Sequence, residues 1–185
     1  MRVIGGIAKG RNLLPPEGMG TRPTLDRIKE SIFNIIQHRV RGAVTVDLFS
    51  GTGSLGIEAA SRGAEKSYLI EMGDSSYSLL KKNVENLKFQ DLCVTLNGDC
   101  YKFLEQFYKE DKKFDIIFID PPYAKEMIPP AVELISKYKL LQKDGLIVTK
   151  IDTSEVIYEG NDEIALFDKR KYGNTTVCFY DYKEK

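Results

Sequence analysis

Tryptophan is absent from this chain of 185 residues, and histidine occurs only as His38. With one histidine, the chain is a poor candidate for a Ser-His-Asp or Cys-His nucleophile. Its three cysteines are odd in number and far from C-x-x-C spacing, which argues against a disulfide framework or a zinc site and indicates a reducing environment. No run approaches the ~20 apolar residues of a membrane span, and the N-terminus lacks the apolar core of a signal peptide. We therefore expect a cytoplasmic protein that needs neither a metal ion nor a membrane.

The net charge of the chain is zero, because 27 basic residues balance 27 acidic ones. The distribution is uneven, however. Residues 1–41 carry eight basic side chains against three acidic ones, so the remainder of the chain is acidic overall. A basic end on an acidic body favours a polyanionic partner, although ordinary solvated surface is the alternative explanation. The basic residues that we expect to bind such a partner are Arg2, Lys9, Arg11 and Arg22.

Beyond residue 43, strand-like and helix-like runs alternate. The expected strands are Val44–Leu48, Ser67–Ile70, Leu92–Leu96, Phe114–Ile119 and Leu146–Lys150. Strands separated by helices imply right-handed crossovers, and hence a mostly parallel α/β sheet with helices on both faces. The end of the chain differs, because Glu163–Asp168 and Thr175–Tyr182 flank the turn RKYGN and predict an antiparallel hairpin.

The first 41 residues stand apart from this alternation. A turn at Lys9-Gly10 predicts a small hairpin, since glycine admits the positive φ of a tight turn. A helix is expected over Leu25–Gln37, with Thr24 as its N-cap and an apolar face. So few residues rarely hold a core of their own. We therefore divide the chain into a basic N-terminal appendage, residues 1–41, and an α/β domain, residues 42–185.

A glycine-rich turn follows the first expected strand of this domain. Gly51, Gly53 and Gly56 form a G-x-G-x-x-G pattern, and the acidic Glu71 ends the next strand. Glycines let a ligand approach the backbone, and a carboxylate accepts hydrogen bonds from ribose hydroxyls. The pattern alone fits a dinucleotide, another nucleotide-like ligand, or a tight turn that binds nothing.

Further carboxylates narrow this choice. Asp47, four residues before Gly51, would repel a pyrophosphate and suits a ligand that carries an amine. Asp99 follows the third strand and Asp120 the fourth, so that four carboxylates, with Glu71, surround the crevice where open α/β sheets bind ligands. This arrangement fits S-adenosylmethionine, which has an amine, a sulfonium, a ribose and an adenine. The candidate cofactor-binding residues are Asp47, Phe49, Gly51, Gly53, Glu71, Asp99 and Cys100.

The stretch FDIIFIDPPY, residues 114–123, ends a buried strand with a carboxylate, two prolines and an aromatic ring. A nucleobase amine is a poor nucleophile because its lone pair is conjugated with the ring. Asp120 and the carbonyl of Pro121 can accept from its two N–H bonds and favour the pyramidal geometry that attack on a methyl sulfonium needs. Pro122 stiffens the elbow, and Tyr123 offers a flat face for an unstacked base. We expect all four residues to be catalytic, and Tyr123 also to bind substrate; a simple Pro-Pro turn is the alternative.

Several stretches together carry a family resemblance. The stretches RVIGGIAKGRNL, TRPTLDRIKESIFN, VDLFSGTGSLGIEAASRGA and DPPY closely resemble the RsmD-type family of bacterial 16S rRNA guanine-N2 methyltransferases. DPPY is generic to the chemistry, whereas the TRPT-x-DR block is specific to this family. The resemblance covers nearly the whole chain, including the Tyr172-Gly173 turn. It implies a Rossmann-like class I fold with a seven-stranded sheet, S-adenosylmethionine as donor, S-adenosylhomocysteine as product, and a guanine of small-subunit rRNA or of the small-subunit particle as target. We expect a monomer.

The resemblance also implies roles by position. Asp47 and the glycine turn would face the methionine portion of the donor, Glu71 its ribose and Asp99 its adenine, while residues 120–123 would hold the target amine. The chain departs from the pattern at Gly73, where the family commonly has an acidic residue. We still expect Glu71 to contact the ribose, but we do not expect a second acidic residue to do so.

Three other functions stay open. An adenine-N6 methyltransferase acting on DNA or RNA would share the amine chemistry, but DNA enzymes of this kind usually need a sequence-reading domain, for which the basic appendage leaves little room. An NAD-dependent oxidoreductase would explain the glycine turn and leave DPPY without a task. An RNA-binding protein without catalytic activity would not need Asp99 and Asp120.

Overall fold

A computed structural model describes residues 1–16 and 23–184 of the chain. Within these residues, seven strands form one sheet in the order β3-β2-β1-β4-β5-β7-β6. The strands are β1 Val44–Asp47, β2 Lys66–Glu71, β3 Cys93–Asn97, β4 Phe114–Ile119, β5 Leu141–Asp152, β6 Ile164–Tyr172 and β7 Thr175–Tyr182. The sheet confirms the expected Rossmann-like fold with its C-terminal hairpin.

The strand order places a ligand crevice at the centre of the sheet. β1 pairs in parallel with both β2 and β4, while β7 runs antiparallel to β5 and β6. The chain moves outward from β1 through β2 to β3 and then returns to the other side of β1 with β4. Open α/β sheets bind ligands at such a reversal, outside the carboxyl ends of the strands.

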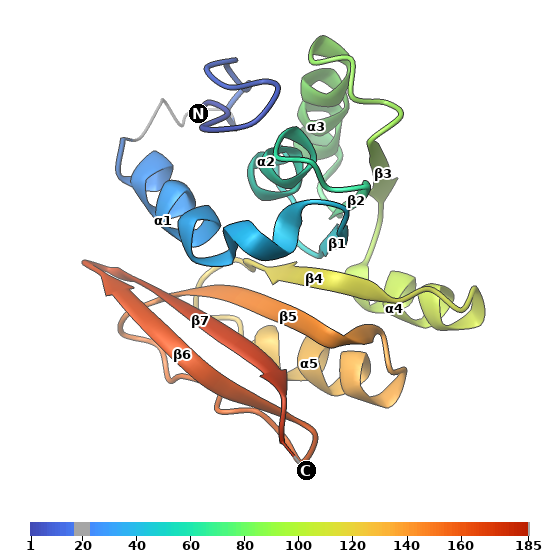
Figure 1. The fold of residues 1–185 in the computed structure, drawn as a ribbon, viewed down its shortest axis with the longest axis vertical. Helices are drawn as coiled ribbons and strands as arrows, with labels where there is room; N and C mark the ends of the chain where they lie inside the picture. Colours follow the sequence, from blue (N-terminus) through green and yellow to red (C-terminus); the bar gives the residue numbers. More distant parts are fainter. Residues whose placement is uncertain (17–22, 185) are drawn as a thin grey trace.

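Helices cover both faces of the sheet. They are α1 Pro23–Val40, α2 Ser54–Ser61, α3 Asp74–Asn86, α4 Cys100–Lys109 and α5 Ile128–Lys137. The first three lie on one face, and α4 and α5 lie on the other (Figure 1). β4 contributes to both layers because successive strand residues point to opposite faces: Ile116 and Phe118 pack with α1, whereas Ile117 and Ile119 pack with α5. Among the helices of the described residues, none is long and apolar enough to cross a membrane.

α1 is longer than the expected helix and is part of the main core. It begins at Pro23 and includes Thr24, so the prediction that Thr24 precedes the helix as its N-cap is wrong. A proline suits the first helical position, where its missing N–H needs no partner. The expected apolar face is confirmed and packs with β4, β5 and β7 through Ile28, Ile32, Phe33 and Ile36. α1 therefore shares its core with the sheet. The division into residues 1–41 and 42–185 remains a prediction, which concerns the RNA-binding role of the first part.

Residues 1–16 pack on α2 and form the small hairpin that the sequence predicts, with backbone hydrogen bonds from the N–H of Val3 to the oxygen of Arg11 and from the N–H of Leu13 to the oxygen of Met1. Arg2 and Asn12 form an isolated β-bridge, and the expected turn lies at Gly10, whose φ is +86°. Gly6 also has a positive φ, +80°, and a Cβ there would lie 1.9 Å from the backbone oxygen of Ser61 in α2. The close packing of this segment on α2 thus requires a glycine.

β5 extends beyond the expected Leu146–Lys150 at both ends. Residues 142–144 are exposed and polar or charged, so the apolar pattern does not reveal that the strand begins at Leu141. Its last residue, Asp152, is held in the sheet by pairing with Thr175 of β7. β6 likewise reaches Tyr172, so the turn into β7 is shorter than the sequence suggests.

Candidate active site

Four carboxylates lie at the carboxyl edge of the parallel strands. Asp47 ends β1 and Glu71 ends β2, while Asp99 comes shortly after β3 and Asp120 directly after β4. Because these strands are parallel and adjacent, their ends share one edge of the sheet. The structure therefore brings together the acidic residues that the sequence predicts to be neighbours.

The two glycines at the start of the turn have different surroundings. Gly51 has φ +56°, and a Cβ built on it meets nothing within 4 Å, so the backbone there faces open space. Gly53 has φ +101°, and a Cβ there would lie 2.7 Å from both Ile57 and Leu80. Gly51 thus leaves room for a ligand, whereas the packing of α2 and α3 requires Gly53.

Glu71 fixes the shape of the glycine turn. Its Oε1 accepts a hydrogen bond from the N–H of Gly51 at 2.9 Å, and its Oε2 accepts one from the N–H of Gly73 at 2.8 Å. A Cβ on Gly73 would lie 3.1 Å from Oε2. A glycine at this position therefore lets the carboxylate bridge two turns, and each oxygen keeps a lone pair for a ligand hydroxyl.

Asp47 is a buried carboxyl group with an unused acceptor. Its side chain is 2 % exposed, and Oδ1 has no hydrogen-bond partner among the described residues. Burial raises the pKa of Asp47 to about 8, and the negative charges of Asp120 and Glu71 add to this effect. A cationic ligand beside Asp47 would stabilise the ionised carboxylate and so lower its pKa.

The remaining residues expected to bind the methyl donor are Asp99, Cys100 and Phe49. Asp99 caps α4, since its Oδ1 accepts from the N–H of Tyr101 at 2.9 Å. Cys100 is buried, and burial raises the pKa of its thiol to about 12, so it is not a thiolate at neutral pH. Phe49 lines a cavity next to the glycine turn. Within the described parts of the chain, no group of three or more His, Cys, Asp or Glu residues could hold a metal ion.

The elbow after β4 places Asp120 beside a lysine. The Nζ of Lys150, on β5, lies 3.3 Å from Oδ2 of Asp120, and the two side chains are 14 % and 32 % exposed. Tyr123 is 58 % exposed, as a surface for a stacked base requires. Lys150 is not among the site residues that the sequence predicts; the available signal was a charged residue in the apolar run LIVTKI.

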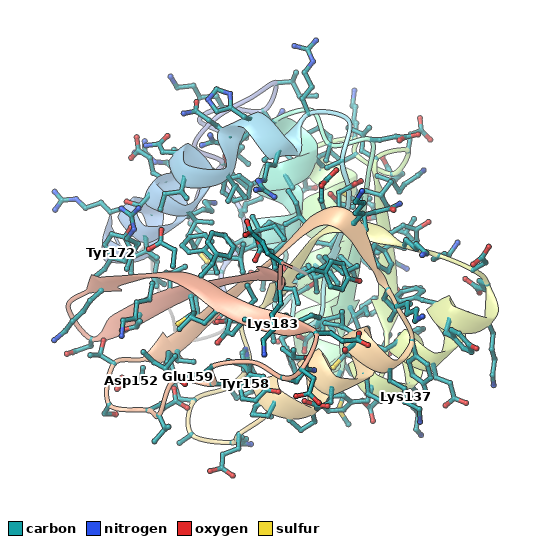
Figure 2. All side chains as sticks on the ribbon, turned by 60° about the horizontal axis from the view of Figure 1, so that its bottom comes forward. Lys137, Asp152, Tyr158, Glu159, Tyr172 and Lys183 are labelled. Atoms are coloured by element: carbon teal, nitrogen blue, oxygen red, sulfur yellow. The ribbon has the colours of Figure 1, made fainter. Side chains whose placement is uncertain are left out.

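A second residue that the sequence analysis missed, Glu155, holds the loop after the elbow. Its carboxylate accepts from the N–H of Ala124 at 2.8 Å and from the N–H of Asp152 at 2.7 Å. Ala124 has φ +58°, a left-handed conformation that is unfavourable for alanine, so this contact helps to keep the loop in place. The connection from β5 to β6, along which Figure 2 labels Asp152, Tyr158 and Glu159, borders a cavity of about 780 Å³ beside the two prolines.

A smaller cavity, of about 230 Å³, lies between α1, the glycine turn and the elbow. Phe49, Gly51 and Asp120 line it, as the sequence leads us to expect for a donor-and-substrate crevice. Charged residues that the sequence analysis did not select, namely Asp26, Lys29 and Lys150, also line it. Residues from the N-terminal appendage and from the α/β domain thus form one cavity.

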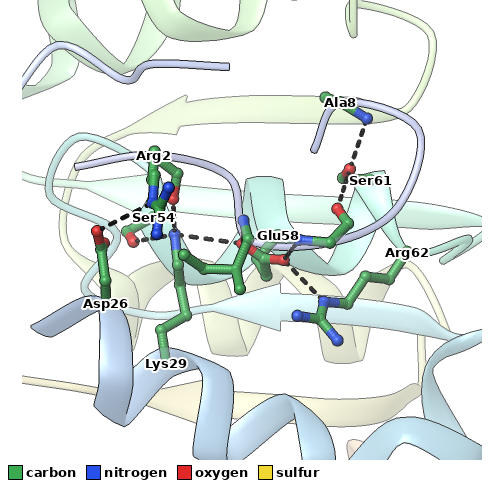
Figure 3. Close-up of polar contacts among 10 residues, drawn as sticks. Arg2, Ala8, Asp26, Lys29, Ser54, Glu58, Ser61 and Arg62 are labelled. Carbon is green, nitrogen blue, oxygen red and sulfur yellow. Dashed lines mark hydrogen bonds and ion pairs between the residues drawn. The ribbon is translucent and has the colours of Figure 1, made fainter. Parts of the chain in front are cut away.

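A buried ion pair joins these two parts of the chain (Figure 3). Glu58 of α2 is fully buried and lies 3.2 Å from Nζ of Lys29 in α1 and 2.7 Å from Nε of Arg62. The same carboxylate accepts from the backbone N–H groups of Ile4 and Gly5. Burial lowers the pKa of Lys29, while Glu58 opposes this shift. The N-terminal segment is therefore fixed as a wall of the cavity.

Arg2, Lys9 and Arg11, which are expected to bind a polyanion, are all exposed on the segment of residues 1–16. Arg2 is exposed and lies 3.5 Å from Asp26, which offsets part of its charge. Lys9 is exposed, and Arg11 donates to the backbone oxygen of Asn86 on α3. Arg22 lies outside the described residues. The proposed contacts of these side chains with a substrate remain a prediction.

Comparisons with known proteins place this geometry in a family. The family described as "Conserved hypothetical protein 95" matches residues 1–181. A Bacillus subtilis protein named "Putative rRNA methyltransferase YlbH" is 37% identical over 180 residues, covering 97% of this chain and 98% of the relative. The Escherichia coli protein named "Ribosomal RNA small subunit methyltransferase D" is 35% identical over 147 residues, covering 80% and 72%. A solved structure titled "Putative methyltransferase yhhF from Escherichia coli" has a TM-score of 0.87 and 29% identity, covering 100% of this chain and 99% of that one.

The fold is that of a class I methyltransferase. The comparisons agree with this class along the full length of the chain. The protein belongs to the "Conserved hypothetical protein 95" family, which confirms the RsmD-type resemblance of its sequence.

Proposed function

We propose that this protein transfers a methyl group from S-adenosylmethionine to the N2 amine of a guanine in small-subunit rRNA. The observation that carries the proposal is that Asp120 shares one cavity with Phe49 and Gly51. A residue suited to bind an amine thus lies beside a turn suited to bind the methyl donor. The names of the relatives support rRNA as the substrate class.

The residues at the strand ends fit the donor. Asp47 offers a buried, unpartnered oxygen to the positively charged amino acid portion. Glu71 retains acceptor capacity for the ribose hydroxyls, and the open space over Gly51 lets the ligand approach the backbone. Asp99 has one oxygen that caps α4, which leaves the other for the adenine amine. These assignments stay predictions of the sequence, and each is compatible with the geometry.

When bound, S-adenosylmethionine supplies an electrophilic methyl group on a sulfonium. The protein has to present the target amine as a nucleophile. Asp120 accepts one N–H of that amine and the carbonyl of Pro121 accepts the other, which localises the lone pair on nitrogen. The rigid Pro121-Pro122 backbone holds the two acceptors at a fixed separation. Tyr123 stacks on the base once it has left its helix.

RNA binding is assigned to the exposed basic residues of the N-terminal appendage. Arg2, Lys9 and Arg11 lie on the segment of residues 1–16 that walls the cavity, so phosphate contacts there would place a nearby nucleotide at the elbow. The acidic remainder of the chain repels RNA, and the appendage supplies the attraction. A monomeric state and a cytoplasmic location remain predictions from the sequence.

The decisive experiment measures methylation by the purified protein with radiolabelled S-adenosylmethionine. Naked 16S rRNA, small-subunit particles and double-stranded DNA are offered as substrates, and the methylated nucleoside is identified by mass spectrometry. We expect N2-methylguanosine from RNA or particles and no label in DNA. N6-methyladenosine as the product would favour the adenine-N6 alternative, and binding of NAD without any methylation would favour the oxidoreductase.

A further inference from the structure

Lys150 is a charged residue at the end of the apolar part of β5. The register of β4 and β5 pairs Ile119 with Thr149, so Asp120 and Lys150 are the next residues along the two strands. Strand residues alternate between faces, and Phe118 and Val148 face α1. Asp120 and Lys150 therefore lie on the same side, where both line the 230 Å³ cavity.

Lys150 has hydrogen-bond donors to spare. An ammonium group carries three N–H donors. Lys29, which also lines the cavity, uses its donors on the backbone oxygen of Arg2, on Ser54 and on Glu58. Lys150 has one hydrogen-bond acceptor among the described residues, Oδ2 of Asp120. Two donors of this largely buried side chain thus remain for a ligand.

We propose that Lys150 binds the target base by donating a hydrogen bond to the ring nitrogen next to the methylated amine. The proposal rests on the function proposed above. On guanine, the N2 amine donates and the neighbouring N3 accepts. Asp120 and Lys150 offer the complementary order, an acceptor and a donor 3.3 Å apart. They would therefore hold two adjacent atoms of the base edge and fix its orientation in the plane.

A base explains Lys150 better than a phosphate does. The side chain is 14 % exposed and opens into a cavity, whereas an RNA backbone remains in solvent and meets exposed cations such as Lys9. Balancing the charge of Asp120 uses one donor of Lys150, and the two remaining donors are available to an acceptor in the cavity.

The test removes the proposed acceptor from the substrate and the proposed donor from the protein. The methylated guanosine is first located by mass spectrometry. Small-subunit rRNA is then made by ligating a fragment that carries guanosine or 3-deazaguanosine at this position, and is used naked or in particles, whichever the wild-type protein methylates. We would measure kcat/KM for the wild type, for Lys150→Met and for Lys143→Met, a control at the exposed start of the same strand.

We expect 3-deazaguanosine to lower kcat/KM by roughly 10- to 100-fold for the wild type and for Lys143→Met. For Lys150→Met, the change from guanosine to 3-deazaguanosine should lower kcat/KM far less, because this variant has no lysine donor that the change leaves unpaired. Equal losses in the wild type and in Lys150→Met would overturn the proposal. If Lys150→Met fails to fold, the wild type decides alone, since an unchanged kcat/KM on 3-deazaguanosine also overturns it. A wild type that never methylates guanosine would instead contradict the proposed function.

Discussion

Asp47 ends β1, Asp120 directly follows the neighbouring strand β4, and the charges of the two residues interact. Burial is the main cause that raises the pKa of Asp47 to about 8, and the negative charge of Asp120 is the next. Near neutral pH, Asp47 is therefore largely protonated in the absence of a cationic ligand. Binding of a positively charged donor should ionise Asp47 and release a proton, which couples donor binding to pH.

This coupling predicts how stability depends on pH without ligand. In the unfolded chain, Asp47 has its usual pKa of 3.8, so between about pH 4 and pH 8 only the folded protein holds this proton. The free energy of unfolding should fall as pH rises through this range, by at most about 1.4 kcal/mol per pH unit from this group, and level off above about pH 8. Asp47→Asn should gain stability relative to the wild type as pH rises, which chemical denaturation at several pH values would measure. The control is Asp91→Asn, at an exposed position. If the free energies of unfolding of Asp47→Asn and the wild type differ by a constant amount across this pH range, the prediction is contradicted.

Asp120→Asn should impair methyl transfer and spare donor binding. The carboxylate serves the target amine, so we expect kcat to fall by roughly 10²- to 10³-fold, as for the loss of a preorganised polar group. Removing this charge also lowers the pKa of Asp47, so calorimetry should find donor affinity unchanged or higher at neutral pH. A loss of affinity as large as the loss of rate would contradict this division of roles.

Glu71→Ala, in contrast to Asp120→Asn, should mainly weaken binding of the methyl donor. The change removes the ribose acceptor and also frees the N–H groups of Gly51 and Gly73, so donor binding should weaken by about 1–3 kcal/mol. Calorimetry with S-adenosylhomocysteine measures this loss directly. Glu71→Gln is the matched control and should lose less, because its amide oxygen can still accept one of the two bonds. Unchanged affinity in Glu71→Ala would mean that other residues hold the ribose.

The buried Glu58 should be more sensitive to truncation than its lysine partner. Glu58→Ala leaves the buried Lys29 without its main counter-ion and removes the acceptor of two N-terminal backbone N–H groups, so we expect a loss of about 3–5 kcal/mol of stability. Lys29→Met should cost less, because Arg62 still neutralises the carboxylate. Denaturant unfolding measures both, with the exposed Glu85→Ala as control. Equal losses of stability in Glu58→Ala and Lys29→Met would mean that Arg62 contributes little to neutralising Glu58.

The basic appendage should control the salt dependence of RNA binding. Each cation that neutralises a phosphate contributes about −0.7 to the log–log salt slope on single strands, so losing four contacts should reduce the slope by roughly 2–3 units. Donor affinity should not change. The variant replaces Arg2, Lys9, Arg11 and Arg22 by alanine, and the control replaces four lysines near the opposite edge of the sheet, Lys113, Lys137, Lys139 and Lys143. An unchanged slope and affinity would assign these charges to ordinary surface.

The order of the elements and the position of the crevice could be predicted from the sequence, because both depend on local pattern. Apolar runs such as 114–119 predict buried strands, and an acidic residue that ends each run must lie at the common edge of a parallel sheet. The elbow could be found because two prolines end a strand wherever they occur. The ends of β5 and α1 could not, since pairing with β7 and packing on the sheet determine them.

The tertiary structure alone decided which charged residues meet. Asp120 and Lys150 are 30 residues apart, and the register of β4 with β5 brings them into contact. Lys29 lies in a helix that looks like an appendage in the sequence, yet it pairs with Glu58 because α1 packs on the same sheet face as α2. The pKa of Asp47 likewise depends on burial and on charges from two other strands. The residue pattern therefore determined what kinds of groups the site contains, while long-range packing determined their partners and their protonation.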